Sequence, residues 1–180
     1  MKIKYWQLGG LSAIAGLALW VWPALAELPR SDTIALVEAL RLAAPKTETA
    51  QTLYSPWKIK PNNIARWSRL CTGRTLTPEA FTADMTQARQ ILVCVMEEIL
   101  LEEYAISQQD RAIAIRRAAA WWVSGDANLY NQGNIAVYTN RVLGFYEELY
   151  ANPTDFIHSK DWDYKPFNVL DSNSDIHGHH

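Results

Sequence analysis

Residues 91–106, which read ILVCVMEEILLEEYAI, decide the fold. From Ile91 to Met96 every side chain is apolar, so a helix over this stretch would be apolar around its whole circumference. A surface helix keeps one polar face, whereas a helix that is apolar on all sides is buried among others. We therefore expect this segment to be the central helix of a bundle.

Capping and breaking residues divide the rest of the chain into further helices. Ser31 can cap the first helix and Pro45 ends it, while Thr77, Pro78 and Glu79 give the third the cap, first-turn and acidic residues typical of a helix start. Residues 46–60 lack helical periodicity and are expected to form a loop, and no segment alternates like a strand. The expected fold is all-α, a single domain of about five helices at residues 31–44, 61–71, 78–106, 108–124 and 126–150.

The first 26 residues have the layout of a secretory signal peptide. Lys2 and Lys4 precede the apolar run of residues 8–22, and small residues stand at Ala24 and Ala26. That run is short for a membrane span, which needs about 20 residues, although an uncleaved anchor remains an alternative. We expect export to the periplasm, or to the thylakoid lumen in a photosynthetic host. The predicted organisation is a leader at 1–26, an all-α domain at 27–150 and an irregular tail at 151–180.

Charge and cysteine content narrow the functional class. The leader holds two lysines and no acid, so its removal changes the net charge of the chain from −2 to −4. Nucleic-acid binding usually requires a basic face, and we expect no nucleic-acid partner.

Cys71 and Cys94 are predicted to form a disulfide because an exported protein meets an oxidising compartment. Two buried free thiols are the alternative.

No metal site and no cofactor are expected. Helical di-iron proteins use Glu-x-x-His pairs, which this sequence lacks. The C-terminal tail brings acids and imidazoles together and could bind a divalent metal. Because chain ends are usually poorly ordered, a solvated terminus is the preferred interpretation of Asp171, Asp175, His177, His179 and His180.

Glu103 is the one carboxylate that falls on the strongest apolar stripe of the central helix, in line with Leu92 and Met96. One turn from a helix end, such a group is expected to reach water or to pair with an arginine of the next helix. General acid catalysis is the alternative role. The available partners are Arg111, Arg116 and Arg117.

Several tryptophans are candidates for binding a ligand or partner. On a helical wheel, Trp122 faces the core, whereas Trp121 lies on the flank beside Arg117. Trp121 could cover the edge of the core through a cation–π contact, or it could stack on a sugar or a partner side chain. Trp57 and Trp162 stand in irregular segments, where each could anchor a partner or pin its own loop.

Residues 118–149, AAAWWVSGDANLYNQGNIAVYTNRVLGFYEEL, resemble the last two helices of lysozyme-like soluble lytic transglycosylases. Those helices comprise an alanine-rich segment, a Tyr-Asn-x-Gly turn and a helix bearing Tyr, Val and Tyr. The family's Glu-Ser catalytic motif and its Gly-Leu-Met-Gln loop are absent here, and Glu38 is the only acid at a comparable position. The residues that match the family are Tyr130, Asn131, Gly133, Tyr138, Val142 and Tyr146.

Two functional hypotheses follow. The first is an exported, non-enzymatic binding or accessory protein of the cell envelope or thylakoid lumen. Its partner would be an envelope protein or peptidoglycan, and it would touch a membrane only through an uncleaved leader. The second, which the resemblance implies, is a peptidoglycan-active glycosidase or lytic transglycosylase. It would use Glu38 or Glu103 as the general acid, and Trp121, Tyr130 and Asn131 would line a sugar groove.

Overall fold

A computed structural model describes residues 28–46 and 53–152 of the chain. The expected leader at 1–26, and the tail beyond Asn152 with Trp162 and the histidines, lie outside the described residues. Within the described ranges, no helix is long and apolar enough to cross a membrane.

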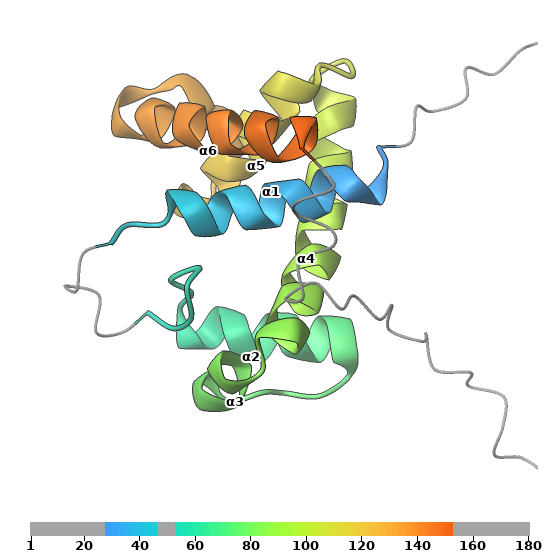
Figure 1. Cartoon of the computed structure of the whole chain (residues 1–180), viewed down its shortest axis with the longest axis vertical. Helices are drawn as coiled ribbons and strands as arrows, with labels where there is room; N and C mark the ends of the chain where they lie inside the picture. Colours follow the sequence, from blue (N-terminus) through green and yellow to red (C-terminus); the bar gives the residue numbers. More distant parts are fainter. Residues whose placement is uncertain (1–27, 47–52, 153–180) are drawn as a thin grey trace, which may run out of the picture.

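The described chain is all-α, as the sequence predicts. α4 links two groups of helices: α1, α5 and α6 pack around one of its ends, and α2 and α3 lie at the other (Figure 1). The elements are α1 (Arg30–Ala43), α2 (Pro61–Thr72), α3 (Pro78–Ala83), α4 (Met85–Ile106), α5 (Arg111–Ser124), the 3-10 helix η1 (Ala127–Asn131) and α6 (Gly133–Ala151).

The prediction of one helix over residues 78–106 is wrong, because the chain breaks at Asp84. The backbone of Asp84 is extended, with φ −115° and ψ 91°, so it ends α3. Its carboxylate accepts a hydrogen bond of 2.9 Å from the backbone N–H of Gln87 and thereby caps α4. An Asp followed three residues later by Gln is the sequence signature of a capping box, and this signal locates the break.

Two other predicted helices start later than expected. Gln108 and Gln109 adopt left-handed backbone conformations, with φ +54° and +67°, so α5 begins only after its N-cap Asp110. Likewise the expected helix over 126–150 is divided, since Gln132 has an extended backbone and separates η1 from α6.

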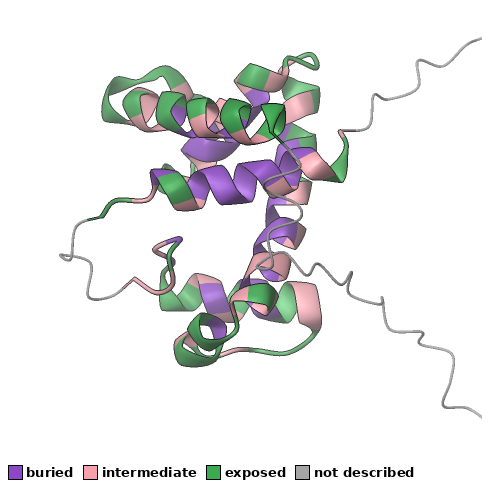
Figure 2. Ribbon diagram, in the orientation of Figure 1, coloured by how far each residue is buried: buried purple, intermediate pink, exposed green. Residues whose placement is uncertain are grey.

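The middle of α4 is the centre of the core. Ile91, Leu92, Val93 and Met96 are fully buried, which confirms the prediction made for this segment. Figure 2 shows this buried stretch continuing into α1. On α5 the buried residues include the consecutive alanines 118–120. Small side chains at a helix contact let neighbouring helices approach closely. The helices that pack against α5 in this way are α4 and α6.

An ordered turn occupies residues 54–59, inside the segment that was expected to be a loop. Tyr54 and Ile59 exchange two backbone hydrogen bonds of 2.9 Å each. Within the turn, Ser55 and Lys58 adopt left-handed conformations with φ +63° and +56°. Trp57 points into the core, where it is 1% exposed and its indole N–H donates a 2.7 Å hydrogen bond to the carbonyl of Val37. Trp57 therefore pins the turn to α1.

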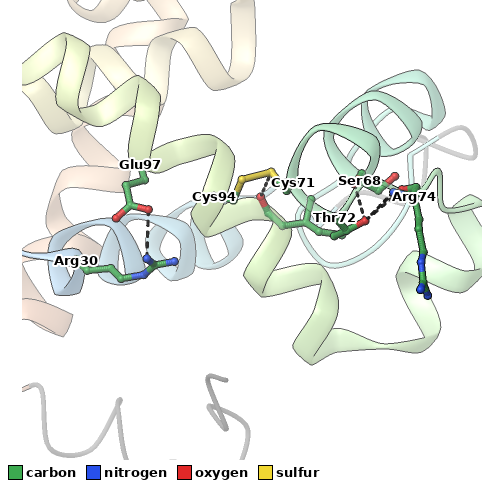
Figure 3. Close-up of a disulfide and its surroundings, with 8 residues drawn as sticks. Arg30, Ser68, Cys71, Thr72, Arg74, Cys94 and Glu97 are labelled. Carbon is green, nitrogen blue, oxygen red and sulfur yellow. Dashed lines mark hydrogen bonds and ion pairs between the residues drawn. A yellow bond between two sulfur atoms is a disulfide. The ribbon is translucent and has the colours of Figure 1, made fainter. Parts of the chain in front are cut away.

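The disulfide predicted from the sequence is present between Cys71 and Cys94 (Figure 3). It joins the last turn of α2 to the middle of α4, with the two Cα atoms 6.1 Å apart. The α2–α3 group is thus tied covalently to the central helix.

Candidate functional site

Two hollows lie side by side along α2 and the C-terminal end of α5. The first, of about 670 Å³, is formed between the end of α1, the turn at 54–59, α2, α5 and the start of α6. The second, of about 680 Å³, lies between α2, α4 and α5. Both volumes fall in the range typical of ligand sites. Arg66, Trp67 and Trp121 line both hollows, so we describe them together as the tryptophan groove.

Three indole rings form the centre of this groove. Trp67 is 6% exposed and stacks on Trp122, with ring centroids 5.5 Å apart. Trp121 meets Trp67 at 6.4 Å with the planes tilted by 30°. Trp122 was expected to be a core residue. It does pack against the core, but it is only half-buried and also lines the first hollow, because α2 covers one face of its ring and leaves the rest open.

Trp121 does not make the cation–π contact that was one of its two expected roles. The guanidinium of Arg117 lies instead over the ring of Tyr130, 5.8 Å from its centroid. Trp121 is half-buried and borders both hollows. Trp121 also packs against the core, and its role as a surface on which a ligand stacks stays a prediction.

The groove is lined by cations that form no ion pair with other described residues. Lys58 and Lys60 line the first hollow, Arg69 lines the second and Arg66 lines both. Across the described chain, none of these four side chains forms a salt bridge. Of the residues described, no carboxylate lines the first hollow, and Glu98 lines the second. Because the whole chain carries a net charge of −2, this is a local concentration of positive charge.

Tyr138 of α6 is a further polar group at the first hollow. Burial raises the pKa of its hydroxyl well above the ordinary value, and nearby Arg141 only partly opposes this effect. Tyr138 therefore stays protonated at neutral pH and can act as a hydrogen-bond donor towards the hollow.

Glu103 forms an ion pair, as its position on the apolar stripe predicts. It is 6% exposed, and its Oε2 lies 2.5 Å from Nε of Arg117. Arg117 also donates a 3.1 Å hydrogen bond to the side-chain oxygen of Asn128. The carboxylate of Glu103 is thus engaged by the neighbouring helix and lines neither hollow.

Glu38 is likewise held by an arginine. It is 5% exposed on α1 and pairs with Arg41, one turn further along the same helix. Its other oxygen, Oε2, has no hydrogen-bond partner within the described part of the chain. Glu38 lines neither hollow, and a catalytic role for it remains a prediction.

Tyr130 and Asn131, the other residues expected to line a sugar groove, lie apart from the tryptophan groove. The backbone carbonyl of Tyr130 accepts hydrogen bonds from Arg116, at 3.1 Å, and from Thr139, at 2.6 Å. Arg116 also lies over its ring, 5.0 Å from the centroid. Asn131 is exposed. Of the residues predicted to bind a ligand, the groove therefore brings together Trp57 and Trp121.

A buried polar cluster that the sequence did not reveal lies between α1, α5 and α6. The expected cap at Ser31 is wrong, because α1 begins directly after its N-cap Pro29. Asp32 therefore lies in the first turn of α1, where it is fully buried. Its Oδ1 accepts a hydrogen bond from the hydroxyl of Tyr146 and lies 3.1 Å from Nε of Arg111. Burial, followed by the contact with Asp32, raises the pKa of Tyr146. The cluster fixes α1 against α5 and α6.

No arrangement suited to a metal was found in residues 28–46 and 53–152: no three His, Cys, Asp or Glu side chains are grouped there.

Comparison of the chain with protein-family models, with curated proteins and with solved structures found no match. The resemblance of residues 118–149 to lytic transglycosylases therefore stays a prediction.

Proposed function

We propose that this protein is an exported, non-enzymatic binding or accessory protein of the cell envelope or thylakoid lumen, and that it binds its partner in the tryptophan groove. One observation carries the proposal: four cations that form no ion pair with any other described residue line a groove of ligand-binding size together with a cluster of indole rings. Tryptophan and arginine are the residues that most often dominate binding energy at interfaces.

The groove chemistry supports binding rather than glycoside cleavage. Cleavage of a glycosidic bond requires a carboxylic acid placed against the leaving oxygen. The first hollow has no carboxylate among its described lining residues. Glu38 and Glu103, the two candidate acids, are paired with Arg41 and Arg117 away from both hollows.

The proposed location rests on the leader and the cysteines. Residues 1–26 have the composition of a signal peptide. The bond between Cys71 and Cys94 is compatible with export, because disulfides persist mainly in oxidising compartments.

The proposal is tested by affinity capture with the exported chain and two matched variants. The groove variant carries Trp121→Ala and Arg66→Glu. The control variant carries Ile106→Ala and Arg74→Glu, two exposed positions that line neither hollow. Each is incubated with a detergent-solubilised envelope extract and, separately, with purified peptidoglycan, and bound proteins and released muropeptides are measured.

We expect the wild-type chain and the control variant to retain the same partner, the groove variant to lose it, and the glycan to remain intact. If the groove variant captured as much of the partner as the wild-type chain, the tryptophan groove would not be the binding site. Release of soluble muropeptides by the wild-type chain would replace the binding function with an enzymatic one, and Glu38 and Glu103 would then be the first residues to substitute.

A further inference from the structure

We propose that the ligand of the tryptophan groove is an extended, acidic peptide segment of a partner protein, with apolar side chains between its carboxylates. This inference rests on the proposed binding function and specifies the chemistry of the partner. It is drawn from three properties of the groove: its hydrogen-bonding character, its division into two hollows and its exposed apolar side chains.

Among the residues that the structure describes, the charged groups of the first hollow are all hydrogen-bond donors. Lys58, Lys60 and Arg66 carry N–H groups and no acceptor. A matching ligand must therefore supply acceptors, and carboxylates supply them together with the opposite charge. A neutral glycan fits less well, because its hydroxyls also donate and need acceptors in return. The uncharged side-chain amide and hydroxyl groups along this hollow are few: Asn63, Ser124 and Tyr138.

The division of the groove favours a chain over a single small anion. The two hollows share Trp67 and Trp121 in their linings. Each holds a cation that the other lacks, Lys58 in the first and Arg69 in the second. One small anion could occupy only one of them, whereas an extended peptide passing over the indole rings would place carboxylates in both. Because Glu98 borders the second hollow, we expect the stronger acidic preference in the first.

Each of the two hollows has an exposed apolar side chain in its lining. Val123 lines the first hollow and is 52% exposed, and Leu70 lines the second and is 66% exposed. Exposed apolar groups next to a site with polar edges are typical of protein-binding surfaces. Together with the edges of the tryptophans they would pack against apolar residues between the carboxylates of the peptide.

The test is fluorescence anisotropy with a labelled synthetic peptide in which Glu alternates with Leu and Trp. The matched probe replaces every Glu by Gln, and a chitin oligosaccharide serves as the neutral glycan. The proteins are the exported wild-type chain, Arg66→Glu, Lys60→Glu and the control Arg74→Glu, each shown by circular dichroism to be folded. We expect the acidic peptide to bind about tenfold more tightly than the Gln peptide, and added salt to weaken its binding.

Arg66→Glu should weaken binding of the acidic peptide by about tenfold or more, because it replaces an attraction shared by both hollows with repulsion. Lys60→Glu should act in the same direction, and Arg74→Glu should have little effect. Equal affinity for the two peptides, or preferential binding of the oligosaccharide, would overturn the inference. So would a dimer that dissociates in Arg66→Glu, since a second copy of the chain would then occupy the groove.

Failure of this inference can be told apart from failure of the proposed function. If neither peptide binds but an envelope protein is still captured by the wild-type chain and lost by the groove variant, the binding function stands and the acidic-peptide ligand is wrong. If a partner is captured equally by the groove variant, the groove is not the binding site, and both the groove assignment and the acidic-peptide ligand are wrong.

Discussion

The indole ring of Trp67 stacks on that of Trp122, with the centroids 5.5 Å apart and the planes at 27°. Trp67 belongs to α2 and Trp122 to α5, so this contact connects the α2–α3 group to the group formed by α1, α5 and α6. The same contact forms part of the wall of the groove. The stability of the fold and the proposed binding would therefore depend on the same pair of rings.

Trp122→Ala should lower the free energy of unfolding by about 2 kcal/mol, since it removes a half-buried ring and its stacking on Trp67. Urea unfolding followed by circular dichroism measures the change. Trp122→Phe keeps an aromatic ring and should lose less than half as much. Equal losses for the two variants would show that stacking at this position contributes nothing.

Replacing Cys71 and Cys94 by Ser should lower the free energy of unfolding by about 3 kcal/mol, because the bond closes a loop with a sequence separation of 23. Leu70 and Val95, the neighbours of the two cysteines, line the second hollow. Loss of the bond should therefore also weaken groove binding, measured by anisotropy under conditions where the variant is fully folded. Unchanged affinity would show that the second hollow forms without the disulfide.

Glu103→Gln should destabilise the protein by about 3 kcal/mol, because it leaves the largely buried guanidinium of Arg117 without its carboxylate. A double variant, Glu103→Gln with Arg117→Met, should recover part of that loss, since the unpaired charge is then gone. Thermal unfolding of the three variants gives the comparison. A double variant that is less stable than Glu103→Gln alone would contradict this account of the pair.

The sequence is sufficient to predict the all-α class, the buried character of residues 91–96, the disulfide and the ion pair of Glu103. Each depends on a local pattern or on the spacing between neighbouring helices. The break at Asp84 could also have been predicted, since its capping box is a local signal between two helical segments.

The groove itself could not be predicted. Its residues come from the segment after α1, the turn at 54–59, α2, α4, α5 and α6. The periodicity within one segment cannot show that such distant segments assemble. The one local signal of the groove was the segment SPWKIKP, in which Trp57 is followed closely by Lys58 and Lys60. Similarly, the pairing of Asp32 with Tyr146 joins residues 114 positions apart, and neither residue shows from the sequence that the other is its partner.

Tyr146→Phe should cost about 1–2 kcal/mol, because it removes a hydrogen bond to a fully buried carboxylate. Tyr130→Phe is the matched control, since its ring contacts with Arg116 and Arg117 remain and its hydroxyl forms no hydrogen bond within the described residues. Chemical denaturation of both variants is the measurement. Equal effects would mean that the hydroxyl of Tyr146 gives no specific stabilisation.

Stability should fall as the pH rises above about 10, the ordinary pKa of tyrosine. Burial raises the pKa of Tyr138 and Tyr146 in the folded chain. Below that pH both states keep these protons and the full stability is present; above it the unfolded chain ionises first, which favours unfolding. Tyr138→Phe should reduce this pH dependence in unfolding experiments between pH 8 and about 11. An identical pH dependence in the variant would contradict the assignment.

The bond between Cys71 and Cys94 makes residues 71–94 a covalently closed ring of chain. That ring contains α3 and the exposed stretch from Gly73 to Thr75. A protease that cut this stretch once would not release a fragment: the two pieces would migrate as one species on a non-reducing gel and separate only after reduction. A nicked molecule would thus keep Trp67 and Trp121 on pieces that remain linked.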